Sequence, residues 1–273
     1  MTKLKNNIGF YIIGSILIVL FCFAIFAEFI MPYDPNVGIL ADRFSHPNST
    51  YWLGTDHLGR DVFSRIIYGA RTTVLIALTI TIGCFIIGSI FGVVAGYFGG
   101  TIDNILMRLV EIISAFPSRI LALAVVGIIG PGIVNLMVAM ILTWWVGFAR
   151  IVRGVTLAVR ENEYVMAAKL YGVPTWQILY KHIIPNTIPQ LLVVMALNMS
   201  WMMTALAGFS LLGLGIEPPF AEWGMMISEA RPYMRDHTYL LLFPGLAIML
   251  AVTAFTILGE KLRDAYDPNQ LNG

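Results

Sequence analysis

Charged residues are scarce in this sequence. Asp, Glu, Lys and Arg make up 12% of its 273 residues, whereas soluble domains carry about 25%. Hydrophobic residues make up 58%, and the mean hydropathy is +0.79. The net charge of +1 and the lack of a dense basic run exclude a nucleic-acid-binding surface. The composition predicts a single membrane domain over residues 1–273, surrounded by lipid.

Metal-site and redox patterns are also absent. The two cysteines, Cys22 and Cys84, lie in apolar segments and have no partner at redox or metal-ligand spacing, so we expect both to pack. No histidine has a second ligand at helix or loop spacing, and we therefore predict no metal site. The four histidines are dispersed along the chain: His46, His57, His182 and His237.

The sequence has no energy source of its own. No Gly-x-x-x-x-Gly-Lys-Ser/Thr phosphate loop occurs, which excludes ATP hydrolysis by that route. The centres of the apolar segments hold no ionisable residue, although ion-coupled carriers place Asp, Glu, His or Lys there. Nor do clustered nucleophiles or acid–base residues indicate a membrane enzyme. We expect a non-enzymatic chain that receives force from a partner; a stand-alone secondary carrier or channel is the alternative.

Long charge-free segments predict an all-α, polytopic membrane protein. Four such segments fall near residues 11–26, 72–98, 188–216 and 239–258. Between residues 101 and 150 we expect two more helices, a third that begins near Asn104 or Met107 and a fourth after a tight Gly-Pro-Gly turn at residues 130–132. The total is six transmembrane helices.

A glycine repeat marks one face of the second helix. Gly88, Gly92, Gly96 and Gly100 recur every four residues, so they share one side of a helix. Small residues at this spacing allow close approach of another helix, and we expect helix packing there.

The distribution of basic residues predicts the orientation. With the amino terminus in the cytoplasm, eleven of the 17 Lys and Arg residues lie on cytoplasmic pieces and six on external loops. Because cytoplasmic loops are enriched in Lys and Arg, both termini and the polar segment 150–186 are expected to face the cytoplasm.

Residues 163–186 form a polar, helix-forming segment between apolar ones. Glu163 suits the first turn of a short helix, because acidic residues complement the helix dipole, and Gly172 suits its end. Pro174 suits the start of a second helix, which we expect to run until Pro185 and Pro189.

The spacing of small residues in this segment resembles a known pattern. Ala167 and Ala168, Gly172 four residues later and Pro185 thirteen after that resemble the EAA coupling loop of binding-protein-dependent ABC importer permeases. Residues 53–65 with 68–71, and residues 209–215, resemble the dipeptide, oligopeptide and nickel branch, second permease subunit type. One position departs from the pattern, since Met166 stands where glutamate usually precedes the two alanines.

The resemblance implies a multi-pass subunit of the bacterial plasma (inner) membrane. It would pair with a second homologous permease, sit on two ABC ATPase subunits that bind ATP and Mg, and receive substrate from an extracellular or periplasmic binding protein. No cofactor would bind to this chain. It also implies an N-terminal span and loop at residues 1–71, a transport core at 72–273 and a coupling loop at about 155–186, between helices 4 and 5. The expected coupling residues are Glu163, Ala167, Ala168, Gly172, Pro174 and Pro185.

The loop after the first helix carries interleaved charges. Asp56, Arg60, Asp61 and Arg65 are expected to form an external ion-pair scaffold, because opposite charges satisfy one another; contact with the binding protein is the alternative.

The sequence indicates the family more clearly than it indicates the substrate. Residues 221–227, with Glu229 and Tyr233, resemble nickel and metallophore permeases more than dipeptide permeases, so nickel or a metal chelate is favoured and peptide import is the alternative. Asn198, Ser200 and Thr204 are candidates for lining the passage, although hydrogen bonds between helices explain them equally well.

Overall fold

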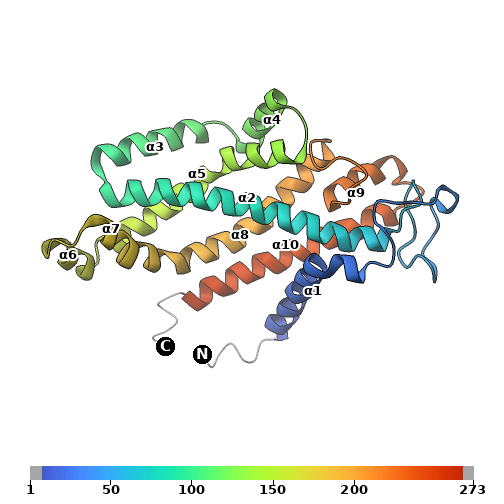
Figure 1. The fold of residues 1–273 in the computed structure, drawn as a ribbon, viewed down its shortest axis with the longest axis horizontal. Helices are drawn as coiled ribbons and strands as arrows, with labels where there is room; N and C mark the ends of the chain where they lie inside the picture. The colour runs from blue at the N-terminus through green and yellow to red at the C-terminus, as the bar shows by residue number, and fades with distance from the viewer. Residues whose placement is uncertain (1–7, 267–273) are drawn as a thin grey trace. The chain divides into compact units, whose positions relative to one another are not determined.

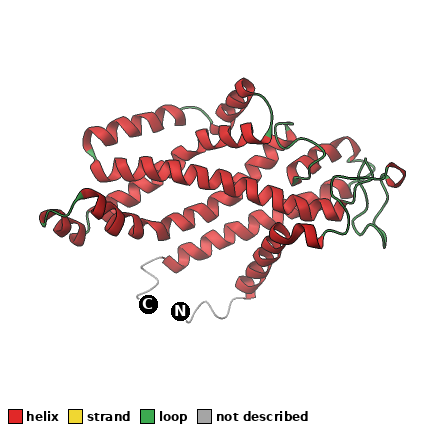
Figure 2. Ribbon diagram, in the orientation of Figure 1, coloured by secondary structure: helices red, strands yellow, loops and turns green. Residues whose placement is uncertain are grey.

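The structure, a computed structural model, describes residues 8–266. Helices dominate this part of the chain, and the β-pairing there is limited to an isolated bridge between Thr55 and Asp61 (Figure 2). The all-α, polytopic class is therefore confirmed. The two termini, whose cytoplasmic placement the basic residues predict, lie outside the described residues.

Five helices have 23 residues or more, and several short ones connect them (Figure 1). The long helices are α1 Ile8–Ile30, α2 Val62–Phe98, α5 Ile133–Arg160, α8 Ile184–Leu211 and α10 Tyr239–Tyr266. The shorter α-helices are α3 Gly100–Ser114, α4 Ser118–Ile129, α6 Glu163–Leu170, α7 Thr175–Ile178 and α9 Trp223–Ala230. Two 3₁₀ turns, η2 Leu40–Asp42 and η4 Arg231–Tyr233, and a π-helix, η3 Leu179–Ile183, complete the set.

The chain forms two compact units. Of the described residues, unit 1 contains 8–79, Gly130–Leu136 and Met199–Leu258, and unit 2 contains Ile80–Ile129, Met137–Asn198 and 259–266. The helices α2, α5, α8 and α10 each contribute residues to both units. This division differs from the one at residue 71 that the resemblance implies, which stays a prediction.

Length and composition identify four helices able to cross a membrane: α2, α5, the run Thr175–Leu211 and α10. The pair α3 and α4, bent by 81°, brings the number to five if it forms one span. The apolar part of α1, Gly14–Ile30, is shorter. The prediction of six spans requires both the bent pair and α1 to cross the membrane.

The helix before the Gly-Pro-Gly turn differs from the expectation in two ways. It begins at Gly100 rather than near Asn104 or Met107, because Gly99 (φ +67°) ends α2 and the chain turns at once into α3. It also breaks before Pro117, since the residue before a proline disfavours the helical conformation. The predicted turn is confirmed, with positive φ at Gly130 and Gly132.

Within unit 2 the glycine repeat packs α2 against α5. A Cβ atom built on Gly88 would lie 2.4 Å from the Cβ of Phe148, and one on Gly96 would lie 2.8 Å from the Cβ of Thr156. These contacts are too short for any side chain, so the expected helix packing is confirmed. Gly100 does not take part, because nothing lies within 4 Å of its Cβ position.

Candidate functional site

The polar segment forms the expected short helix with a defined end. In α6 the amides of Val165 and Met166 donate to the carbonyl of Asn162. At the other end, the amide of Gly172 donates to Lys169 and that of Val173 donates to Ala168, both at 3.1 Å. Gly172 has φ +72°. This is a Schellman motif, which ends a helix and needs a residue that tolerates a left-handed conformation.

The second helix starts as expected but does not stop at the two prolines. Pro174 is the N-cap of α7, and its carbonyl accepts from the amides of Gln177 and Ile178. The helix then passes through the π-helix η3 into α8, which contains Pro185 and Pro189. The predicted end at Pro185 is therefore wrong. A proline clashes with the carbonyl four residues earlier, and a wider π-turn directly before Pro185 relieves that clash.

A buried cluster in unit 2 fixes α6 and α7 to the ends of α2 and α5. Val165 of α6, Ile178 of α7 and Ile183 of η3 are at most 1% exposed, and they pack with Tyr97 and Val159. Each such aliphatic side chain stabilises its position by about 1.5–3 kcal/mol. The short helices are therefore held as a rigid projection, visible at one end of α2 and α5 in Figure 1.

The projection also carries several large apolar side chains that are exposed. Leu170 and Tyr171 are 88% and 87% exposed, and Trp176 and Tyr180 are 69% and 70% exposed. Large exposed apolar patches mark interaction surfaces, and aromatic side chains are the usual anchors of such surfaces. We call this surface the apolar tip; its members are Tyr164, Met166, Leu170, Tyr171, Trp176 and Tyr180.

The predicted coupling residues lie on or beside the apolar tip. Glu163, Gly172 and Pro174 are exposed, Ala167 is half-buried, and Ala168 packs against the buried cluster. The last of them, Pro185, is exposed in the first turn of α8. The structure thus places all of these residues except Pro185 on the projection, and their role in coupling stays a prediction.

Two cationic residues that the sequence did not identify, Arg160 and Lys169, contact the end of α2 at the projection. Nη1 of Arg160 donates to the carbonyls of Gly96 and Tyr97, at 3.0 and 3.1 Å. Nζ of Lys169 lies 4.8 Å from the centroid of the Tyr97 ring. Burial, and then the positive charge of Arg160, lower the pKa of Lys169. Their partners on α2 lie more than 60 residues away, so no local pattern indicates these contacts.

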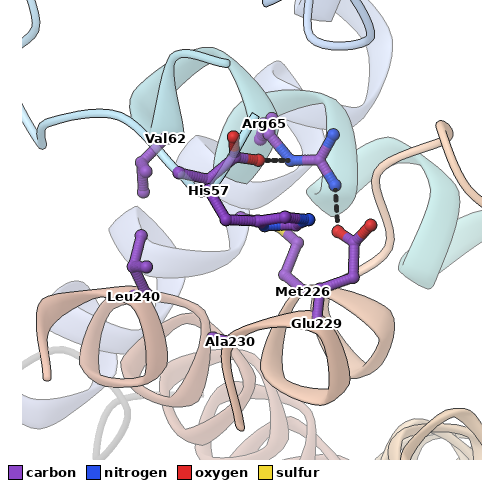
Figure 3. A pocket seen from close by; sticks show the side chains of 8 residues that line it. His57, Val62, Arg65, Met226, Glu229, Ala230 and Leu240 are labelled. Atoms are coloured by element: carbon purple, nitrogen blue, oxygen red, sulfur yellow. Dashed lines mark hydrogen bonds and ion pairs between the residues drawn. The ribbon is translucent and has the colours of Figure 1, made fainter. Parts of the chain in front are cut away.

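In unit 1 the interleaved charges of the loop form a buried network. Nε of Arg60 lies 2.6 Å from Oδ2 of Asp56, and the guanidinium groups of Arg60 and Arg65 both reach Oε2 of Glu229, at 3.0 and 2.9 Å. The ion pair of Arg65 with Glu229 is drawn in Figure 3. Both arginine side chains are 1% exposed. The sequence did not identify Glu229 as their partner, because it lies 164 residues beyond Arg65.

Asp61, the remaining member of the charged group, makes a separate local contact. Oδ2 of Asp61 accepts from both the amide and the hydroxyl of Ser64, which caps the first turn of α2. A cavity of about 20 Å³ beside the network is lined by His57, Arg65, Met226 and Glu229 among others (Figure 3). It holds about one water molecule and is too small for a solute. The burial supports the scaffold interpretation, since neither guanidinium is accessible to a partner.

The stretch that favoured a nickel-type permease also has a structural explanation. Glu222 is fully buried, and its carboxylate accepts from the amides of Gly224 and Met225 at the start of α9. The same carboxylate accepts from the hydroxyl of Ser210 at 2.7 Å. Glu222 therefore caps α9, and this role requires no particular substrate.

The three candidates for the passage are hydrogen-bonded to backbone carbonyls. Asn198 donates to Val194 within its own helix, and Thr204 donates to Ser200 in the same way. Ser200 donates to the carbonyl of Val252 in α10. Hydrogen bonds within and between helices thus account for their polarity, and their place in a passage stays a prediction.

Three of the four histidines are closer in space than in sequence. The rings of His46 and His237 are 6.1 Å apart, and His237 stacks on Phe44 at 4.2 Å. His57 stacks on Tyr233, which in turn contacts Phe44. Dispersal along the chain therefore does not keep these three residues apart in space. Among the described residues, however, no group of three or more His, Cys, Asp or Glu side chains could hold a metal ion.

Comparison with solved structures shows that the fold resembles those of chains from two ABC transporters. The chain resembles one from an inward-facing MetNI methionine ABC transporter with a TM-score of 0.62 at 18% identity, over 75% of this chain and 98% of that one. It resembles a chain of an amino acid ABC transporter with a TM-score of 0.58 at 16% identity, over 74% and 94%. At these identities the likeness concerns the fold alone.

Sequence comparison then defines the family. Residues 88–271 match the model for the binding-protein-dependent transport system inner membrane component, and this chain belongs to that family. It is 40% identical to the glutathione transport system permease protein GsiD of Pectobacterium atrosepticum, over 93% of this chain and 85% of the relative. It is 40% identical to the dipeptide permease DppC of Bacillus subtilis, over 93% and 79%. It is 37% identical to the nickel permease NikC of Escherichia coli K12, over 90% and 89%.

Family membership makes the chain a multi-pass membrane protein and an ABC importer permease. The stand-alone carrier or channel, which was the alternative from the sequence, is thereby replaced. The relatives are named as permease subunits, in agreement with the lack of a phosphate loop in this sequence.

Proposed function

We propose that this permease docks on ABC ATPase subunits through the apolar tip of α6 and α7. The observation that carries the proposal is a surface of exposed aromatic and aliphatic side chains directly backed by a buried cluster. A partner that covers this surface would press on a rigid body rather than on a mobile loop. ATP and Mg bind to the partner chains, and the permease forms the substrate passage with a second, homologous permease.

The mechanism follows from the way the projection is held. Closure of the ATPase subunits moves the apolar tip, and the tip moves the ends of α2 and α5 because Val165 and Ile178 are locked between them. A rigid-body shift of this kind switches the passage between outward and inward access. The proposal places the tip and both termini in the cytoplasm, in the bacterial inner membrane, with the loop of residues 31–61 facing an external binding protein.

The departure at Met166 fits an apolar mode of docking. Met166 is 49% exposed beside Leu170, and Glu163 lies nearly one turn earlier. We infer that the contact with the ATPase is made by apolar side chains here, and that Glu163 supplies its polar edge.

Leu170→Ser tests the docking surface, with Val37→Ser, an equally polar change at an exposed site (66%) in unit 1, as the matched control. The permease would be purified with its ATPase subunits, and both the amount of bound ATPase and the rate of substrate uptake would be measured. We expect Leu170→Ser to lose ATPase subunits and uptake while its membrane level equals that of Val37→Ser. Full ATPase binding by Leu170→Ser would refute the docking surface.

Two substrate classes follow from the relatives. Nickel or a metal chelate is favoured by the resemblance in residues 221–227, and di- or oligopeptides are favoured by the names of relatives at 40% identity. Because Glu222 caps α9, the first of these arguments is weaker than it is from sequence alone. Peptide import is therefore supported as well as nickel import.

Uptake measurements in cells with and without this chain separate the two classes. Labelled nickel, free and chelated, would be compared with a labelled dipeptide at equal concentration. Loss of nickel or chelate uptake alone on deletion assigns the metal class, and loss of peptide uptake alone rejects it.

A further inference from the structure

Residues from three different helices make contacts at the C-terminal end of α2 in unit 2. They are Tyr97 of α2, Arg160 at the end of α5 and Lys169 in the last turn of α6. None of them belongs to the apolar tip, and none lies in the pattern of small residues that marks the coupling loop. Their contacts nevertheless join the projection to a helix that is distant in the sequence.

Arg160 caps the end of α2. The last carbonyls of a helix have no partner within it, and Arg160 donates to two of them, on Gly96 and Tyr97. A cation at this position also interacts favourably with the negative end of the helix dipole. The fit is close, because a Cβ on Gly99 would lie 3.1 Å from Nη1 of Arg160.

Lys169 makes the matching contact from α6. Its ammonium lies over the Tyr97 ring at 4.8 Å, within the range of a cation–π interaction. The body of the Tyr97 side chain is 8% exposed and packs in the same cluster as Val165 and Ile178. One tyrosine thus receives a cation from α6 and apolar contacts from α6 and α7.

Chain connectivity explains why these contacts matter. Two residues, Glu161 and Asn162, join α5 to α6, and α7 runs through η3 into α8. The helix α2 has no such direct connection to the projection, so its link to α6 is made by non-covalent contacts, those of Tyr97 and those of Val93 with the buried cluster. The glycine face then joins α2 to α5 along their lengths.

We propose that Arg160 and Lys169 are positioning residues that clasp Tyr97 and make α2 follow α6 during the ATP cycle. We call Tyr97, Arg160 and Lys169 the α2 latch. This inference rests on the proposed function, because it assumes that force reaches the apolar tip. The force passes to α5 and α8 through their covalent connections to the projection. It passes to α2 through these two cations.

A distance measurement tests the latch directly. Spin labels at Phe98 (50% exposed) and at Thr175, an exposed residue of α7 outside the apolar tip, would report the separation of α2 and the projection in the ATPase complex, in a chain with Cys22 and Cys84 replaced by alanine. We expect the same distance distribution without nucleotide and with trapped ATP. In the double variant Arg160→Gln and Lys169→Met the two distributions should differ. Equal distributions in the double variant would overturn the latch.

Transport measurements provide the second test. We expect Lys169→Met to lower uptake per ATP hydrolysed by about two- to fivefold, the range for a single cation–π contact. Arg160→Gln should lower it by about tenfold, because it removes two hydrogen bonds from a charged donor. A purely structural role would lower the amount of assembled complex but leave uptake per ATP at the wild-type value, which would refute the latch.

The controls separate the latch from general effects and from the docking proposal. Arg108→Gln removes a charge from an exposed ion pair and Lys261→Met removes one from a partly exposed pair, and both variants should couple ATP hydrolysis to uptake as the wild type does. All variants would be compared at equal amounts of bound ATPase. If Leu170→Ser binds ATPase normally, the docking proposal fails. If Leu170→Ser loses ATPase and the latch variants couple like wild type, only the latch fails.

Discussion

The packing of α2 on α5 makes a quantitative prediction for Gly92. A Cβ added there would lie 2.6 Å from the Cβ of Val152, 2.7 Å from the carbonyl oxygen of Ala149 and 2.9 Å from the amide nitrogen of Arg153. Two of the three contacts are with backbone atoms, so a change of side-chain rotamer cannot relieve them. The helices must separate, which loosens the contacts of Gly88 and Gly96 as well.

Two opposing effects decide how much Gly92→Ala changes the stability of the permease. Alanine favours a helix over glycine by about 0.8–1.0 kcal/mol. Overpacking of a close contact costs about 1–3 kcal/mol, and more where the neighbour is backbone. We therefore expect a net loss of stability of up to about 2 kcal/mol. Gly154→Ala on the facing helix is the matched control, because nothing lies within 4 Å of its Cβ position and helix propensity alone should act there.

Thermal unfolding of the purified permease in detergent measures this difference. One kcal/mol corresponds to about 2–4 °C in the unfolding midpoint of a chain near this size. Gly92→Ala should unfold several degrees below wild type, and Gly154→Ala at or above it. If Gly92→Ala is as stable as Gly154→Ala, the close contact of α2 with α5 is not present in the protein and the reasoning fails.

Four further substitutions have defined outcomes. Gly172→Val should insert normally but uncouple ATP hydrolysis from uptake, because a β-branched residue resists φ +72° at the helix end; uptake per ATP measures this. Glu229→Gln should reduce the yield of folded protein by leaving two buried arginines short of a partner, at a cost of about 3–5 kcal/mol. Glu222→Ala should lower the unfolding midpoint, through loss of a cap worth about 1–2 kcal/mol. Ser200→Ala should leave uptake unchanged if its hydroxyl only joins α8 to α10.

Features that depend on neighbouring residues could be predicted from the sequence. The start of α6 at Glu163 and its end before Gly172 follow from the helix dipole and from the freedom of glycine, both of which act within one turn. The turn at residues 130–132 follows from the same local rules. The glycine face of α2 also has a local signature, because the spacing of its glycines matches the period of a helix. The residues of α5 that pack against it have no such signature in the sequence.

The errors occur where one local rule competes with another or with a distant contact. Pro185 was expected to end a helix, but the π-helix before it accommodates the ring, and no sequence rule predicts that compensation. Pro117 does break its helix, whereas the sequence is interpreted as one helix from Asn104 or Met107 to the Gly-Pro-Gly turn. Glu229 and Tyr97 were not identified because their partners lie far along the chain.

The sequence of α6 shows how eight residues serve two purposes. The helix turns by about 100° per residue, so residues three or four apart share a side. Val165 and Ala168 face the buried cluster, whereas Met166 and Leu170 lie on the exposed side. Lys169 follows Ala168 and reaches the Tyr97 ring from the edge between these two sides. If the tip docks on the ATPase as proposed, a change on the exposed side, such as Met166 in place of the glutamate usual in the pattern that this segment resembles, would alter what the tip binds without altering how the tip is held. The docking surface could then change with the ATPase partner while the buried contacts are kept.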